Sequence, residues 1–297
     1  MSHNHSHHNH VPASGDYSAK FKFGIIINLL FVLIEFVFGI IYGSLALIAD
    51  AGHNLSDVIG LVIAWVASYL VTKKPTKNFT YGYKKSSILA AQLNSLILLV
   101  AVGIIIWEAV NRLSSSAQVE GGVLIIVAGI GVIINGVTTF LFFGGKDSDL
   151  NIKGAYLHML ADTLISVGVV VSGVIILFTN ASWIDPVISI VIATVISWST
   201  WKLLQDATKL SLDAVPDSIN ITKVKKYFEE LTQLCDYHDL HIWALSTTET
   251  ALTVHIIKDS TISNDDLLLQ VNTDLNSLFG ISHVTVQLEE MECKNGC

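Results

Sequence analysis

Six long apolar stretches occupy the first two thirds of the chain. They cover residues 23–42, 45–71, 88–110, 122–143, 155–178 and 183–201. A helix needs ~20 predominantly apolar residues to cross the ~30 Å of hydrocarbon in a bilayer. The pattern therefore predicts six membrane-spanning α-helices.

The pattern changes after residue 206. Apolar residues recur at helical spacing over 218–232 and 264–279, and short strand-like runs lie at 237–245, 251–258 and 281–290. This αββαβ order predicts a small two-layer α+β domain with an open sheet. We thus expect three segments, which are a His-rich tail at 1–20, a six-helix membrane domain at 21–206 and a soluble domain at 207–297.

Composition narrows the class of protein. Hydrophobic residues make up 52% of the 297 residues and charged residues 14%, whereas a soluble domain carries roughly 25% charged residues. This balance excludes an ordinary soluble enzyme and a disordered chain. No basic face is available for binding a nucleic acid. What remains is a protein of the lipid bilayer.

The distribution of charge predicts the orientation in the membrane. The formal charge of −8 lies on residues 207–297, which hold 14 acids and 6 Lys, while residues 1–206 are balanced. Eleven Lys flank one side of the predicted spans and only Arg112 flanks the other. Because cations gather on the cytoplasmic side, both termini are expected in the cytoplasm. The start of the chain lacks the pattern of a cleaved signal peptide, and with the short loops this favours a bacterial inner (plasma) membrane.

Two of the predicted spans carry the same pair of ionisable residues, His53-x-x-x-Asp57 and His158-x-x-x-Asp162. Such groups are costly at bilayer depth, so each is a candidate functional residue. A spacing of four puts both side chains on one helix face. One pair alone is equally well explained by an internal hydrogen bond. Two helices packed face to face would offer two imidazole nitrogens and two carboxylates, which is a tetrahedral set that zinc favours.

With these residues the sequence resembles the cation diffusion facilitators, a family of zinc-type metal cation/proton antiporters. The similar runs are GSLALIADAGHNLSD at 43–57, TYGYKK at 80–85, HMLADTLISVGVVVSG at 158–173, LDAVP at 212–216 and HDLHIWAL at 238–245. The resemblance implies six transmembrane helices, a ferredoxin-like cytoplasmic domain and a homodimer. It also puts the two His-x-x-x-Asp pairs at the positions of the family's transport site, with zinc preferred and cadmium or cobalt as secondary cargo.

The resemblance further implies a regulatory zinc site in the cytoplasmic domain, held by His238, His255, His283 and Glu289. Alternation along a strand agrees in placing His283 and Glu289 on one face. His241 has the opposite parity to His238, so we expect it to pack or to lie on the surface.

Other residues are weaker candidates. Cys293 and Cys297, together with His5 and His7, resemble the extra metal ligands of some family members, although a Cys-x-x-x-Cys run at a chain end is as often accidental. Lys85 and Asp213 match a charge pair that links the two domains in the family.

The expected function is export of zinc from the cytoplasm in exchange for protons, by alternating access. A cadmium- or cobalt-preferring carrier and a membrane metal sensor that does not transport are the alternatives. An intramembrane zinc hydrolase is disfavoured, because it needs an open coordination position and a motif such as His-Glu-x-x-His. We therefore expect no enzymatic activity.

Overall fold

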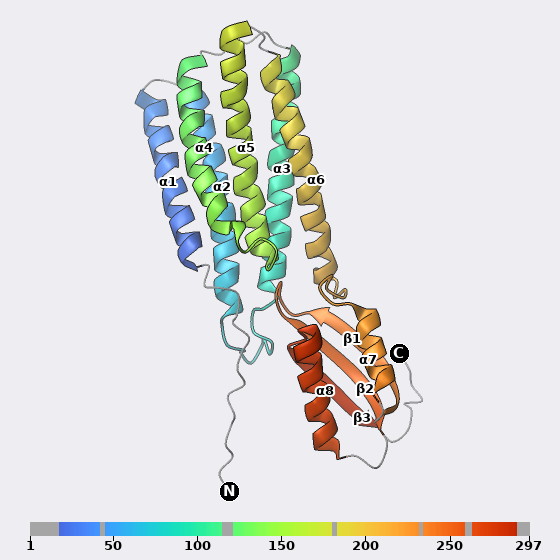
Figure 1. The fold of residues 1–297 in the computed structure, drawn as a ribbon. Helices are drawn as coiled ribbons and strands as arrows, with labels where there is room; N and C mark the ends of the chain where they lie inside the picture. The colour runs from blue at the N-terminus through green and yellow to red at the C-terminus, as the bar shows by residue number, and fades with distance from the viewer. Residues whose placement is uncertain are drawn as a thin grey trace.

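The computed structural model describes residues 18–41, 45–114, 121–179, 183–231, 234–258 and 263–289. Within these residues six long helices form a bundle that stands above a small α/β domain (Figure 1). The helices of the bundle are α1 (Ser18–Ile41), α2 (Leu45–Val71), α3 (Ser86–Ser114), α4 (Gly121–Phe143), α5 (Leu150–Thr179) and α6 (Ile184–Ser211).

The bundle is apolar outside and partly polar inside, as expected for helices surrounded by lipid. Large apolar side chains such as Trp107, Phe140 and Phe178 are exposed. The buried polar or charged side chains of the bundle include Asn28, Glu35, Asn54, Asp57, Asn94, Asn135, Asn151, His158 and Asp162. Neighbouring helices pack as α1 with α2, α3 with α6 and α5 with both α4 and α6.

Length and hydropathy identify part of this bundle as membrane-spanning. Among the described residues, three helices contain an apolar segment long enough to cross a bilayer, Ser18–Phe38 in α1, Ser86–Asn111 in α3 and Pro186–Ser211 in α6. Shorter apolar segments lie at Asp57–Val71 in α2 and Ala128–Phe143 in α4.

The C-terminal domain has the order that the hydrophobic pattern predicts. Its elements are α7 (Ile221–Glu230), β1 (Leu234–Ala244), β2 (Thr250–Lys258), α8 (Asn264–Phe279) and β3 (His283–Glu289). The described strands form one mixed sheet of order β1-β2-β3. Strands β1 and β2 form an antiparallel hairpin, whereas β2 and β3 are parallel because α8 carries the chain back across the sheet.

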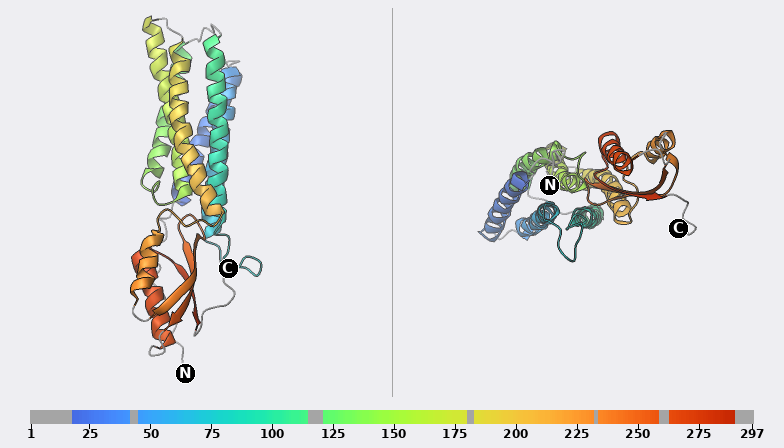
Figure 2. Two further views of the ribbon diagram at one scale, coloured as in Figure 1. Left: turned by 90° about the vertical axis from the view of Figure 1, so that its right-hand side faces the viewer. Right: turned by 90° about the horizontal axis from the view of Figure 1, so that it is seen from below.

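Both helices of this domain cover the same face of the sheet (Figure 2). Val224 and Phe228 of α7 and Val271 of α8 are fully buried against Leu252 and Val254 of β2. Helix α7 begins later than its apolar pattern predicts. The side chain of Asn220 accepts a hydrogen bond from the backbone N–H of Lys223 and so caps the helix. The other face of the sheet carries no helix among the described residues.

The two domains meet at the turn between β1 and β2. The backbone N–H of Thr247 donates to Oγ of Ser87 (3.1 Å), and its hydroxyl donates to Oδ2 of Asp149 (3.0 Å). Lys84 and Glu249 form an ion pair beside this contact. An apolar cluster of Ile88, Leu210 and Ala244, with Leu150 against it, completes the junction. The turn is therefore held at the ends of α3 and α5.

Candidate metal centres

Three ionisable side chains converge inside the bundle. Asp57 of α2 and His158 and Asp162 of α5 are each less than 8% exposed. Nε2 of His158 lies 2.7 Å from Oδ1 of Asp57. One ligand atom from each of the three residues lies within 4.8 Å of the others. His53 belongs to α2, but its side chain is outside the part of the chain that the structure describes.

Small residues allow α2 and α3 to approach α5 at this level. A Cβ atom on Gly60 would lie 3.9 Å from Cε1 of His158 and 3.9 Å from Oδ1 of Asn94. Nδ2 of Asn94 donates to the carbonyl oxygen of Gly60 (3.3 Å), which ties α3 to α2. A larger residue at position 60 would therefore have to share this space with the His158 ring.

Hydrogen bonds between buried side chains hold α1 to its neighbours. Nδ2 of Asn54 donates to Oε2 of Glu35 (2.7 Å), and this joins α2 to α1. Nδ2 of Asn28 donates to Oγ1 of Thr138 (3.1 Å) and to the carbonyl oxygen of Gly24, which joins α1 to α4. In an apolar surrounding these bonds fix which helix faces meet.

The donor set of the intramembrane cluster fits zinc. Zinc binds imidazole nitrogen and carboxylate oxygen at ~2.0–2.2 Å in a tetrahedron, so its ligand atoms lie about 3.3–3.6 Å apart. The three described ligand atoms are within small side-chain rotations of that spacing. Helix α2 contributes one of the three and α5 two, since a spacing of four places His158 and Asp162 on one face.

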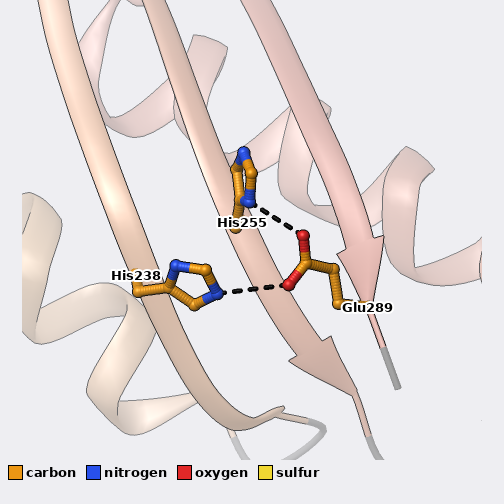
Figure 3. Close-up of side chains that lie close together, drawn as sticks. All are labelled: His238, His255 and Glu289. Carbon is orange, nitrogen blue, oxygen red and sulfur yellow. Dashed lines mark hydrogen bonds and ion pairs between the residues drawn. The ribbon is translucent and has the colours of Figure 1, made fainter. Parts of the chain in front are cut away.

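A second cluster lies on the open face of the C-terminal sheet, with one residue from each strand (Figure 3). His238 of β1 and His255 of β2 are opposite each other in the antiparallel pair. Nε2 of His238 is 3.3 Å from Oε2 of Glu289, and Nδ1 of His255 is 2.9 Å from its Oε1. These side chains are only partly buried. Two imidazoles and one carboxylate again form a set suited to zinc.

His283 is not part of this cluster, which corrects the expectation from the sequence. It is paired with Ala251, whereas His255 is paired with Gln287. His283 precedes Glu289 by six positions along β3, which is roughly 20 Å at ~3.3 Å per residue. The ring of His283 instead packs edge-on against Tyr81, with 5.4 Å between ring centroids. Alternation predicted the face correctly, but it carries no information about position along the strand.

Asp239 and His241 belong to the cluster's surroundings. Sequence reasoning missed Asp239, whereas it expected His241 to pack or to lie on the surface, where its side chain is 59% exposed. Strand β1 has a bulge between His238 and His241, where Asp239 has a φ of 54°. The inserted residue resets the alternation, so both histidines face the open side. Oδ1 of Asp239 lies 2.7 Å from Nε2 of His241 and its Oδ2 lies 3.6 Å from Nε2 of His255. The Asp between two His was the available signal, since Asp tolerates a positive φ better than most residues.

Of the remaining candidates from the sequence, the structure describes the Lys85–Asp213 pair but not the terminal His and Cys residues. Lys85 and Asp213 form an ion pair of 2.6 Å with both side chains about half exposed. This pair joins the residue before α3 to the residues after α6. His5, His7, Cys293 and Cys297 lie outside the described residues.

Comparison with protein families identifies the family of this chain. Residues 22–210 match the cation efflux transmembrane domain, and residues 216–291 match the cytoplasmic domain of cation efflux proteins. The chain therefore belongs to the cation diffusion facilitator family, as its motifs indicated. It is a multi-pass membrane protein with a cytoplasmic C-terminal domain, and it is a divalent metal cation efflux transporter and not an enzyme.

Similar proteins match nearly the whole chain. The metal cation efflux system protein CzcD of Cupriavidus metallidurans is 36% identical over 97% of this chain and 91% of its own length. The cadmium, cobalt and zinc/H(+)-K(+) antiporter of Bacillus subtilis is 34% identical over 95% and 91%. The zinc transporter ZitB of Escherichia coli is 33% identical over 99% and 94%. A solved structure, the metal-bound C-terminal domain of CzcD from C. metallidurans, is 33% identical over 24% of this chain and 99% of that chain, with a TM-score of 0.23.

Proposed function

We propose that this protein exports Zn²⁺ from the cytoplasm in exchange for protons, through a site formed by His53, Asp57, His158 and Asp162. The observation that supports this most is the convergence of Asp57, His158 and Asp162 in the core of the bundle. Buried carboxylates and an imidazole at this depth are costly and need a function to retain them.

The His158–Asp57 contact gives a physical basis for exchange. It uses the imidazole Nε2 and a carboxylate oxygen, which are the same atoms that would bind a metal ion. Metal ligands must be deprotonated, so metal binding releases protons and protonation expels the metal. If the site opens alternately to the two sides, a proton gradient drives the ion outward.

The arrangement in the membrane is part of the proposal. We propose that all six helices α1–α6 span the bilayer, with both termini in the cytoplasm and with the inner plasma membrane as the location. The apolar segments of α1, α3 and α6 and the outward apolar side chains support this arrangement. The proposed segments are a tail at 1–20, the membrane domain at 21–206 and the cytoplasmic domain at 207–297.

The cytoplasmic cluster is proposed as a regulatory zinc site in a homodimer. His238, His255 and Glu289 supply its ligands, and the helix-free face of the ferredoxin-like sheet leaves them accessible. Cys293, Cys297, His5 and His7 stay candidates for further ligands of that site. Lys85 and Asp213 would keep the two domains in register close to the membrane surface.

Selectivity is proposed from the ligand chemistry. Imidazole and carboxylate ligands suit zinc, whereas soft metals select thiolate. The B. subtilis relative is named for cadmium, cobalt and zinc, so a carrier that prefers cadmium or cobalt is the alternative. Uptake of each metal into everted vesicles, with and without a pH gradient, separates the two.

Zinc flux in proteoliposomes tests the function. An imposed proton gradient should drive Zn²⁺ through the wild-type protein in the direction opposite to the protons. Asp57→Ala or Asp162→Ala should abolish this flux. Asp217→Ala, the same change at a carboxylate that is exposed on the surface, is the matched control. Wild-type flux in either site variant would refute the site. Zinc binding without flux in the wild-type protein would favour a sensor.

A separate variant tests the regulatory site. His255→Ala should transport zinc, but its rate should no longer respond to cytoplasmic zinc in the way that the wild-type rate does. Complete loss of flux in a normally folded His255→Ala protein would contradict the regulatory role.

A further inference from the structure

A line of residues on α5 leads from the cytoplasmic end of the helix to the transport site. At about 100° per residue, Asn151, Gly154, His158 and Asp162 fall within an arc of roughly 80°. Asn151 is in the first turn of α5, about 10 Å along the helix axis from His158 at 1.5 Å per residue. This face is thus polar, or free of side chain, from the cytoplasmic end up to the ligands.

The side chain of Asn151 makes no hydrogen bond within the described residues. It is 0% exposed, and neither its amide oxygen nor its amide nitrogen has a hydrogen-bond partner there. Its backbone N–H donates to Oδ1 of Asp149 at 2.6 Å. A buried polar group without a partner costs about 1–3 kcal/mol. A leucine, which branches at the same atom, would avoid this cost, so the amide needs another explanation.

Asn94 of α3, on the side that faces α5, is also buried with an amide oxygen that has no partner among the described residues. It is 7% exposed, and its Nδ2 is bonded to Gly60. Gly60 lies one helical turn from Asp57 toward the cytoplasmic end of α2. A Cβ atom on Gly154 would lie 3.9 Å from Cβ of Asn94. Cδ2 of the fully buried Leu203 would lie 3.6 Å from the same added Cβ atom. The two glycines therefore let α2, α5 and α6 pack closely around Asn94, on the cytoplasmic side of His158.

We propose that Asn94 and Asn151 form a cytoplasmic entry subsite, where two neutral amide oxygens replace water ligands of a divalent cation on its way to the transport site. This inference rests on the proposed export function. An amide oxygen is a weaker ligand for zinc than imidazole or carboxylate, so the ion binds briefly and moves on. Amides do not titrate, so this step works equally at every pH while the transport site exchanges protons.

Asn151→Leu in the full-length protein gives the sharpest test. Removal of an uncompensated buried amide should leave the melting temperature unchanged or raise it. Zinc flux in proteoliposomes at low zinc should fall about tenfold, the equivalent of one lost ligand interaction of ~1.4 kcal/mol. The number of zinc ions bound at equilibrium should not change, and the ratio of variant to wild-type flux should be constant with pH.

Asn28→Leu is the matched control. It makes the same substitution at a buried asparagine that is bonded to Gly24 and Thr138, so it should lower the melting temperature. Asn151→Ala serves if the larger leucine prevents folding, with the same fall in flux expected. Wild-type flux in Asn151→Leu or Asn151→Ala would overturn the entry subsite, while the transport function would stand. A melting temperature of Asn151→Leu that falls as far as that of Asn28→Leu would overturn the subsite in the same way. Absence of zinc flux in the wild-type protein would overturn both.

Discussion

Nε2 of His158 lies 2.7 Å from Oδ1 of Asp57, so side chains that are 101 residues apart in the chain join α5 to α2 in the core of the bundle. The contact is more than 90% shielded from solvent on both sides. Because a buried polar partner left alone is expensive, both residues contribute to the packing of these helices as well as to the proposed zinc site.

Asp57→Asn should separate the two contributions. An amide of the same shape can still bond to the imidazole, so the melting temperature without metal should change little. In a His255→Ala background, which removes the cytoplasmic site, zinc at 100 times its Kd should stabilise the parent protein by ~2.7 kcal/mol. Asp57→Asn should lose this zinc-induced rise in thermal unfolding. An equal rise in both proteins would show that Asp57 does not bind the ion.

Asp239→Asn should weaken zinc binding at the cytoplasmic cluster. A carboxylate behind a metal-binding imidazole fixes its orientation and basicity, and loss of such a partner typically costs 10–100-fold in affinity. Asp239 is 3.6 Å from Nε2 of His255, the nitrogen that faces away from Glu289. Isothermal titration of the full-length protein with zinc measures this affinity. Asp236→Asn, on the same strand and exposed, is the control and should match wild type.

The side chain of Asp149 should contribute more to the free energy of unfolding than the Thr247 hydroxyl that donates to it. Its Oδ1 caps the start of α5 by accepting from the backbone N–H of Asn151, and its Oδ2 accepts from Thr247. Asp149→Ala removes both bonds and should cost about 1 kcal/mol for the cap alone. Thr247→Val removes only the hydroxyl bond to Asp149 and keeps the backbone bond to Ser87. Unfolding measurements should rank the variants in this order, and hydrogen exchange should increase in the β1–β2 turn of both.

The stability of the cytoplasmic domain should fall at alkaline pH. Burial, reinforced by the hydrogen bond to Asp274, raises the pKa of the Tyr227 phenol above its ordinary value. The folded state then keeps a proton that the unfolded state loses from about pH 10, so this contribution is complete below pH ~10 and is lost as the pH rises further. Tyr227→Phe should show a shallower decline in thermal stability from neutral pH to about pH 11. An identical decline in both proteins would exclude Tyr227 as the cause.

The Lys85–Asp213 pair should contribute little to stability. Its side chains are 49% and 55% exposed, and exposed pairs are worth ~0–1 kcal/mol and are screened by salt. Lys85→Ala should therefore lower the free energy of unfolding by less than ~1 kcal/mol, and by less still in high salt. A larger loss would mean that the pair is shielded in the assembled protein. The exchange variant Lys85→Asp/Asp213→Lys should then recover part of it.

Local rules predicted the elements well, and they placed three of the four proposed intramembrane residues on helices α2 and α5. The lengths of the apolar runs gave the six helices, and a four-residue spacing placed His158 and Asp162 on one face without any knowledge of the neighbours. The cytoplasmic cluster depends on strand register, which spacing does not encode, and His283 was therefore assigned wrongly. A one-residue bulge hid Asp239 and changed the face of the sheet on which His241 lies. Asn151 gave no signal, because an asparagine in the first turn of a helix is ordinary until its burial is known.

Each strand of the C-terminal sheet carries one residue of the proposed zinc site, and this affects when the site can form during synthesis. No single strand holds two of the three, and the last to emerge, Glu289, reaches the others only after α8 has crossed the sheet. A nascent or misfolded chain therefore cannot capture the ion through this set of ligands, and cellular zinc would be drawn only by domains that have completed their topology.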